Sequence, residues 1–175
     1  MKVSPPSQYE DLRRAVARDS YWAERLRGLL GGRPHEFSLH LGVFVEPYLG
    51  HVLAGRKTVE SRFSVVRCPP YRRVRRGDTL LLKASGGPIV GLCEVRDAWY
   101  YHLDPGSWKF IRKEFAEALC AQDPEFWQAR EKASYATLLR INRVTHVPPF
   151  SWAKRDRRGW VVVAPGTEAT LIEDI

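Results

Sequence analysis

The sequence predicts an α+β fold, namely a small β-barrel of five to six short strands with flanking helices and an N-terminal helical extension. Apolar residues alternate with period two in several short segments separated by glycine turns, a pattern typical of barrel strands. Near the N-terminus, apolar residues instead recur every three or four positions, as in an amphipathic helix. Strands and long helices do not alternate regularly, so a small barrel is favoured over a parallel sheet.

The composition is that of an ordinary globular protein. The 175 residues are 44% hydrophobic and 27% charged, which suffices for one compact core. No apolar run approaches the about 20 residues that a membrane span needs, and the N-terminus lacks the apolar stretch of a signal peptide. We therefore expect a soluble, cytoplasmic protein without a membrane partner. The three cysteines lie far apart and the five histidines lack metal-ligand spacing, so we expect no disulfide framework, no metal and no cofactor.

Three parts are expected along the chain: a helical extension over residues 1–36, a barrel domain over 37–165 and a C-terminal tail over 166–175. The apolar spacing of residues 7–30 predicts one amphipathic helix. Ser7 and Glu10 fit a capping box at its start, and two glycines follow its end. We expect this helix to pack on the barrel. The alternative is a module that binds a protein partner through the helix.

The barrel is expected to begin with a strand over residues 37–45 that has one face on the core. Pro47 stands where a short helix can begin, and Gly55 where a left-handed residue can end it. The next elements, in chain order, are an extended segment over 57–63, a long loop over 64–78, a strand over 79–83, a turn at 86–88 and a strand over 89–99. Gly91 in the middle of that strand indicates a β-bulge.

The C-terminal half is expected to hold two more helices and two more strands. These are a helix over 108–120 capped by Ser107, a helix opened by Asp123 and Pro124, an extended segment over 135–147 ended by Pro148 and Pro149, and a strand over 159–164.

Positive charge is concentrated in two segments. The net charge is +8 and the isoelectric point about 9.7. Residues 56–83 contain nine basic and only two acidic residues, and residues 154–158 form a second basic cluster. Such concentrated charge points to an anionic partner, RNA first and DNA as the alternative. Solvated basic loops are the structural alternative.

The loop over residues 64–78, the arginine loop, has the composition of a phosphate-binding surface. Guanidinium groups bind phosphate bidentately, and Tyr71 offers a stacking face for an unpaired base. Trp152 beside the second basic cluster repeats this arrangement, although both rings could instead pack in the barrel. The cations expected to contact nucleic acid are Arg67, Arg72, Arg73, Arg75, Arg76, Lys154, Arg155, Arg157 and Arg158.

The segment from Gly55 to Arg62 combines an ammonium, a carboxylate and a guanidinium directly after a predicted helix end. On an extended strand Glu60 and Arg62 share one face, and Lys57 can swing toward it. Such a cluster can bind a phosphate or a base edge. It can also do chemistry, with Lys57 polarising an oxygen and Glu60 moving a proton. The structural alternative is an ion network that holds the helix to the strand.

The pattern Gly55-x-Lys57-x-x-Glu60-x-Arg62 resembles the signature of the ASCH domain family, a branch of the PUA-like superfamily. Residues 76–80 and 159–163 are also similar to that family, so the resemblance covers residues 37–165. It implies a β-barrel with a cleft that takes RNA or a modified nucleobase. Lys57, Glu60 and Arg62 are the positions that it assigns to this cleft.

The resemblance also implies two metal-independent hydrolase activities as alternatives to binding alone. Some members are amidohydrolases acting on acetylated cytidine through a Lys, a Thr and a Glu. Lys57 matches the lysine, Glu60 occupies the threonine position, and Glu114 or Glu117 lies in the region of the glutamate. Other members are ribonucleases that use a lysine with a tyrosine and a serine. Lys57 and Tyr48 match the first two of these residues, and the candidates for the serine are Ser134 and Ser151.

Overall fold

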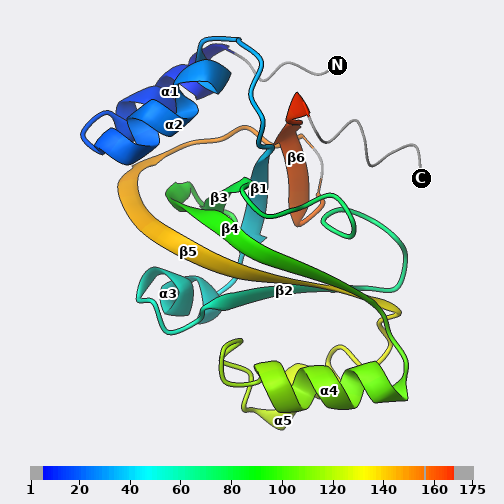
Figure 1. Cartoon of the computed structure of the whole chain (residues 1–175). Helices are drawn as coiled ribbons and strands as arrows, with labels where there is room; N and C mark the ends of the chain where they lie inside the picture. Colours follow the sequence, from blue (N-terminus) through cyan, green and yellow to red (C-terminus); the bar gives the residue numbers. More distant parts are fainter. Residues whose placement is uncertain (1–5, 156, 168–175) are drawn as a thin grey trace.

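A computed structural model describes residues 6–155 and 157–167 and contains one mixed six-stranded sheet that curls into a half-barrel (Figure 1). The strand order is β2-β5-β4-β3-β1-β6, in which β1 and β3 are parallel and the other pairs antiparallel. The strands are β1 Leu39–Phe44, β2 Val59–Ser64, β3 Thr79–Ala84, β4 Ile89–His102, β5 Tyr135–Phe150 and β6 Trp160–Ala164. The α+β fold expected from the sequence is confirmed.

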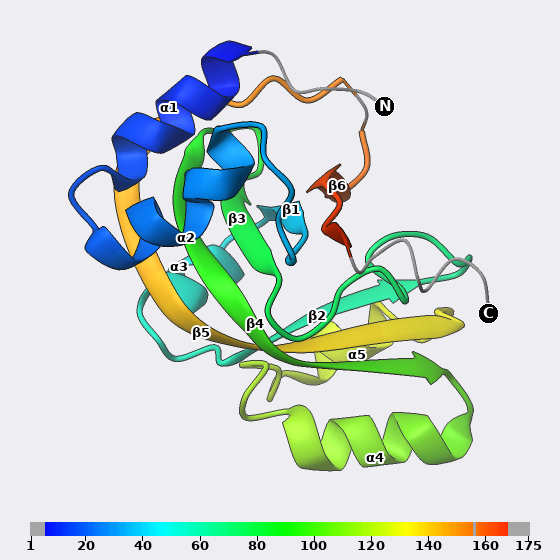
Figure 2. The same cartoon turned by 45° about the horizontal axis from the view of Figure 1, so that its top comes forward.

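Five helices of the described residues flank this sheet. They are α1 Pro6–Val16, α2 Ser20–Leu30, α3 Tyr48–Leu53, α4 Pro105–Phe115 and α5 Pro124–Gln128. Helices α1 and α2 lie near one end of the sheet, and α4 and α5 lie at the opposite end (Figures 1 and 2). None of the helices in these ranges is long and apolar enough to cross a membrane.

The long strands β4 and β5 curve because their pairing is interrupted by bulges. Their register shifts at three places, one of them between Ile89 and Gly91. A Cβ atom added at Gly91 would lie 2.8 Å from the carbonyl oxygen of Thr145, so only glycine permits this close approach. The bulge expected at Gly91 is confirmed, and such bends allow a six-stranded sheet to wrap around its core.

The expected single N-terminal helix is wrong, since the chain forms the separate helices α1 and α2. Asp19 adopts an extended conformation and its carboxylate accepts a hydrogen bond from the backbone N–H of Trp22, which starts α2. Ser7 lies inside the first turn of α1, so the expected capping box does not form. Gly31 follows the end of α2 as expected.

The two N-terminal helices also change the environment of β1. Leu12, Trp22 and Leu26 are buried in one cluster with Leu39 and Leu41 of β1. Five of the six residues of β1 are buried, so the expectation of a strand with only one buried face is wrong. A covering layer contributed by residues distant in sequence cannot be read from the alternation of the strand itself.

Several further boundaries differ from expectation; for example, α4 ends at Phe115 and β4 continues to His102. Helix α4 is capped by Asp104 rather than by Ser107, and the two residues form a reciprocal capping box. Strand β5 continues through Pro148 and Pro149 to Phe150, which pairs with Ile89 at the end of the sheet. Prolines are tolerated there because a strand end has few ladder hydrogen bonds to lose. Asp123 caps α5 as expected.

The expected tail begins at Gly166, whose backbone N–H donates to the hydroxyl oxygen of Ser38. Residues 168–175 lie outside the described residues. The division into extension, barrel domain and tail stays a prediction.

Candidate functional site

A cavity of about 420 Å³ lies between the end of β1, helix α3, strand β2 and the segment that begins with α5. All three residues of the charged motif line it, together with Tyr48. The complete lining of described residues is Val43, Phe44, Val45, Tyr48, Lys57, Glu60, Ser61, Arg62, Phe63, Phe126, Ala129 and Arg130. The motif therefore faces an open hollow.

The turn between α3 and β2 places the motif at this cavity. Gly55 has a φ of +75°, a conformation that favours glycine, and it ends the helix as expected. The backbone N–H groups of Arg56 and Lys57 then both donate to the carbonyl oxygen of His51. This tight turn directs Lys57 inward before β2 begins.

Lys57 is almost completely buried, with 3% of its surface exposed. Its Nζ donates to the carbonyl oxygen of Leu119 at 3.2 Å and lies 3.6 Å from Oε2 of Glu60. The ammonium also lies 5.6 Å from the centre of the Tyr48 ring. Burial lowers the pKa of Lys57, and the negative charge of Glu60 partly opposes this effect.

Arg62 holds together the open side of the half-barrel. Its Nε donates to Oε1 of Glu60 at 2.8 Å. Its Nη2 donates to the carbonyl oxygen of Val43 at 2.9 Å, and its Nη1 to that of Gly159 at 3.2 Å. Since β2 and β6 form opposite ends of the sheet, one guanidinium spans the gap between them. The interpretation of the motif as a structural ion network is supported for Arg62.

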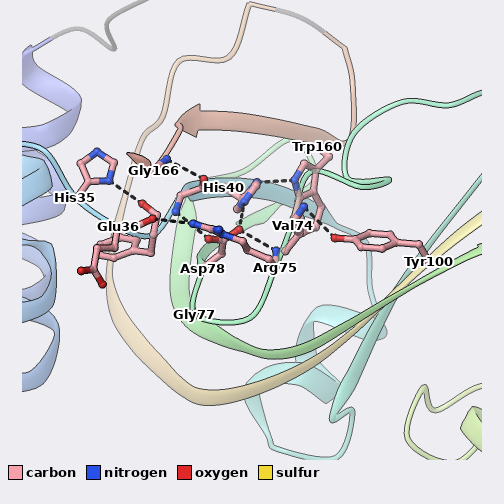
Figure 3. A network of polar contacts seen from close by, with 12 residues as sticks. His35, Glu36, His40, Val74, Arg75, Gly77, Asp78, Tyr100, Trp160 and Gly166 are labelled. Carbon is pink, nitrogen blue, oxygen red and sulfur yellow. Dashed lines mark hydrogen bonds and ion pairs between the residues drawn. The ribbon is translucent and has the colours of Figure 1, made fainter. Parts of the chain in front are cut away.

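The guanidinium of Arg62 also contacts Trp160, which belongs to a second polar network whose centre, at His40 and Asp78, is buried (Figure 3). The indole N–H of Trp160 donates to Nδ1 of His40 at 3.1 Å. Because indole is a donor only, Nδ1 is the acceptor, and Nε2 of His40 carries the hydrogen that it donates to Asp78 at 2.9 Å. The backbone N–H groups of Ser38 and Arg75 donate to the same carboxylate.

The network anchors the C-terminal part of the arginine loop. Asp78 binds the backbone of Arg75, and the hydroxyl of Tyr100 accepts a hydrogen bond from the backbone N–H of Val74 (Figure 3). Apart from Ser64, which ends β2, the loop contains no helix or strand. None of its residues lines the cavity described above, so the arginine loop does not form a wall of it.

The stacking roles expected for Tyr71 and Trp152 are contradicted by their burial. Each residue is 8% exposed. Tyr71 packs between Tyr100 and Tyr135, and Trp152 packs against Phe150 and Tyr9. Apolar rings with partners of complementary shape lose water-exposed area by packing, so both are part of the core.

The basic residues near these rings have mixed environments. Arg67 is exposed and lies over the Tyr135 ring at 5.4 Å, and Arg75 donates to the carbonyl oxygen of Glu36 at 3.1 Å. Among the other cations expected to contact nucleic acid, Lys154 is half-buried. The remaining six are exposed: Arg72, Arg73, Arg76, Arg155, Arg157 and Arg158.

Arg130, Phe63 and Phe126 also line the cavity, although no sequence pattern predicted them as site residues. Arg130 follows α5, lies 3.7 Å from the centre of the Phe126 ring and donates from Nη1 to the Phe126 carbonyl oxygen at 2.8 Å. Burial lowers the pKa of Arg130. The local sequence around Arg130 alternates in charge, as at many solvent-exposed helix ends. Arg130 is therefore recognised as a cavity residue only from the tertiary position of α5.

Of the residues named for hydrolysis, the cavity contains Tyr48 in addition to Lys57 and Glu60. The four candidates for a further glutamate or serine are not among the residues that line it: Glu114, Glu117, Ser134 and Ser151. The described residues also contain no group of three or more His, Cys, Asp or Glu side chains that could hold a metal ion.

We expect the Lys57 ammonium to release its proton below the ordinary value of 10.5, because burial disfavours the charged form. The unfolded chain then binds this proton more tightly, so the free energy of unfolding rises as the pH increases from the lowered pKa toward 10.5. The measurement is an NMR titration of ¹³C-lysine-labelled protein, with Lys57→Arg identifying the Lys57 signal. A Lys57 midpoint at or above 10.5 would contradict the prediction.

Comparison with known proteins agrees with this fold and motif. The ASCH domain family model matches residues 43–148, and no curated protein matches the chain. Among solved structures, ASCH from Zymomonas mobilis is similar at 11% identity and a TM-score of 0.58, covering 78% of this chain and 93% of that chain. A single-substitution variant of that protein gives 10% identity and a TM-score of 0.57, covering 78% and 94%. Because the family match spans more than half of the chain and includes the whole charged motif, this chain belongs to the ASCH domain family and has a PUA-like fold.

Proposed function

We propose that the chain binds single-stranded RNA and takes one nucleotide unit into the cavity at Lys57, Glu60 and Arg62. The observation that carries this proposal is the composition of the cavity. It combines cations and a carboxylate with the half-buried aromatic ring of Tyr48. Proteins recognise unpaired bases by this combination, because a ring stacks on the base while polar groups bind its edge or the adjoining phosphate.

A single strand is favoured over a duplex because a base can enter a cavity only when it is unstacked. Within the site, Glu60 holds the two neighbouring cations in place, since its oxygens lie 2.8 Å from Nε of Arg62 and 3.6 Å from Nζ of Lys57. Membership of the ASCH domain family supports RNA over DNA as the partner, and DNA remains the alternative.

The exposed basic residues outside the cavity would bind the phosphates that flank the inserted unit. Arg157 and Arg158 immediately precede Gly159, whose carbonyl oxygen accepts a hydrogen bond from Arg62, a residue that lines the cavity. The arginine loop adds exposed guanidinium groups at Arg72 and Arg73. Such contacts track the backbone without reading the sequence.

Fluorescence anisotropy with a labelled single-stranded RNA tests the proposal. If about five cations contact phosphates, the logarithm of affinity falls with the logarithm of salt concentration with a slope near −3.5. The double charge reversal Arg72→Glu/Arg73→Glu weakens binding and flattens this slope. The matched control Arg13→Glu/Arg14→Glu makes the same change in net charge on exposed positions of α1. Absence of RNA binding, or equal loss in both double variants, would contradict the proposal.

Hydrolysis of RNA, or of an acylated cytidine nucleoside, is the second candidate function. Burial lowers the pKa of Lys57 inside the cavity that also contains Glu60 and Tyr48, and such a pKa is a property of catalytic lysines. Denaturing gels of the same binding mixtures, without added metal, detect cleavage. Cleavage that Lys57→Met abolishes without lowering the melting temperature would support the hydrolase.

The protein-partner alternative has less support. The apolar residues of α1 and α2, such as Leu12 and Leu26, are buried against the sheet rather than presented to solvent. The two helices therefore stabilise the half-barrel by covering β1.

A further inference from the structure

We infer that Arg130 binds a phosphate group within the cavity, so that the ligand is a nucleotide unit rather than a bare base or nucleoside. This inference rests on the proposed function and adds to it the residue that recognises the anionic part of the ligand. Arg130 lies outside the charged motif, 68 residues after Arg62 in the sequence, and lines the same cavity.

The two cations of the motif, Lys57 and Arg62, already bind acceptors within the protein. Arg62, on β2, donates to Glu60 and to two backbone carbonyl oxygens at the opposite end of the sheet, those of Val43 and Gly159. Lys57 is 3% exposed and shares its ammonium between Glu60 and the Leu119 carbonyl oxygen. A ligand phosphate would have to break these contacts in order to bind either cation, and Glu60 would repel it.

Arg130 has a different arrangement. The Phe126 ring covers one face of its guanidinium, and the Phe63 ring centre lies 5.9 Å away. Among the described residues the guanidinium donates one hydrogen bond, from Nη1 to the Phe126 carbonyl oxygen, and pairs with no carboxylate within 4.0 Å. Guanidinium has five N–H donors in a planar fork, so an edge remains for bidentate binding of a phosphate.

The charge of the cavity favours an anion at this position. Three cations and one carboxylate line it, and that carboxylate is bound to Lys57 and Arg62. The groups that act electrostatically on Arg130 are Tyr48, Glu60 and Arg62. A phosphate at Arg130 would balance the excess positive charge, and partial burial strengthens a charge-assisted hydrogen bond. Stacking on Phe126 also fixes the orientation of the Arg130 guanidinium before the ligand binds.

The test uses the full chain and competition against the labelled RNA by the four ribonucleosides, their 5′- and 3′-monophosphates and short RNA oligomers. We expect at least one phosphate-bearing competitor to bind about tenfold to a hundredfold more tightly than the matched compound without the phosphate. Arg130→Gln removes this preference, measured as the ratio of nucleotide affinity to nucleoside affinity within the same variant. Arg140→Gln is the control, because Arg140 also stacks on an aromatic ring, that of Trp99, but lies outside the cavity.

The outcomes separate this inference from the proposed function. If only oligomers depend on Arg130, the phosphate belongs to the RNA chain; if monophosphates do so too, a free nucleotide is also a ligand. If the protein binds RNA but binds nucleosides and nucleotides equally tightly, the inference is overturned and the proposed function is not. The same holds if the preference for the phosphate survives in Arg130→Gln. Absence of binding by RNA, nucleosides and nucleotides overturns both. Should Arg130→Gln fail to fold, Arg130→Lys keeps the charge without the fork and is expected to lose most of the preference.

Discussion

Replacing Glu60 by alanine is expected to lower the free energy of unfolding by about 3–5 kcal/mol. Glu60 is 5% exposed and lies between Lys57 and Arg62. Its removal leaves the buried ammonium of Lys57 without a counter-charge and takes one of the three acceptors from Arg62. Urea unfolding followed by circular dichroism measures the change, and the melting temperature should fall by about 6–20 °C.

A double substitution shows whether Glu60→Ala loses stability because Lys57 is left as an unpaired buried charge or because a cavity forms. Lys57→Met/Glu60→Leu removes both members of the buried pair, and replacement of such pairs by apolar residues is often neutral. We expect this double variant to regain much of the stability lost in Glu60→Ala. Glu24→Ala is the exposed control, because the ion pair of Glu24 with Arg27 is solvated. A loss below about 1 kcal/mol in Glu60→Ala would show that the pair contributes little.

Replacing Asp78 by alanine is expected to destabilise the fold by a similar amount, about 3–5 kcal/mol. Three donors lose their acceptor together: Nε2 of His40 and the backbone N–H groups of Ser38 and Arg75. His40 and Asp78 are 0% and 1% exposed, so water cannot replace the lost hydrogen bonds without opening the core.

Asp97→Ala is the matched control for this change. Asp97 forms an ion pair with Arg140 at 3.5 Å, but 34% of its side chain is exposed, so its loss should change the free energy of unfolding by less than about 1 kcal/mol. Limited proteolysis adds a local measurement, because Asp78→Ala should expose the arginine loop to trypsin. Equal stability of the two variants would contradict the role assigned to the buried network.

Several features of the site were predictable because they depend on neighbours in sequence. The period-two spacing of Glu60 and Arg62 places both on one face of β2, and Gly55 predicts the turn that directs Lys57 inward. The close packing at Gly91 was predictable for the same reason, since a glycine inside a strand signals a close approach of the backbone.

The roles of individual cations and rings were not predictable in the same way. Tyr71 and Trp152 are aromatic residues beside cations, as in base-stacking sites, yet their packing partners bury both of them. Arg62 is of the residue type that binds phosphates, yet its hydrogen bonds to the carbonyl oxygens of Val43 and Gly159 join the two ends of the sheet. Burial and hydrogen-bond partners depend on which segments meet, and local sequence does not contain that information.

The sequence by itself determined the fold class, the family and the position of the charged motif, because alternation, turn residues and motif spacing act over a few neighbouring residues. The tertiary structure alone decided that Arg130 and two phenylalanine rings complete the cavity, that Arg62 spans the open side of the sheet, and that Asp78 anchors the arginine loop. Arg62 lies 19 positions from Val43 and 97 from Gly159, and a curled sheet brings these residues together only after folding.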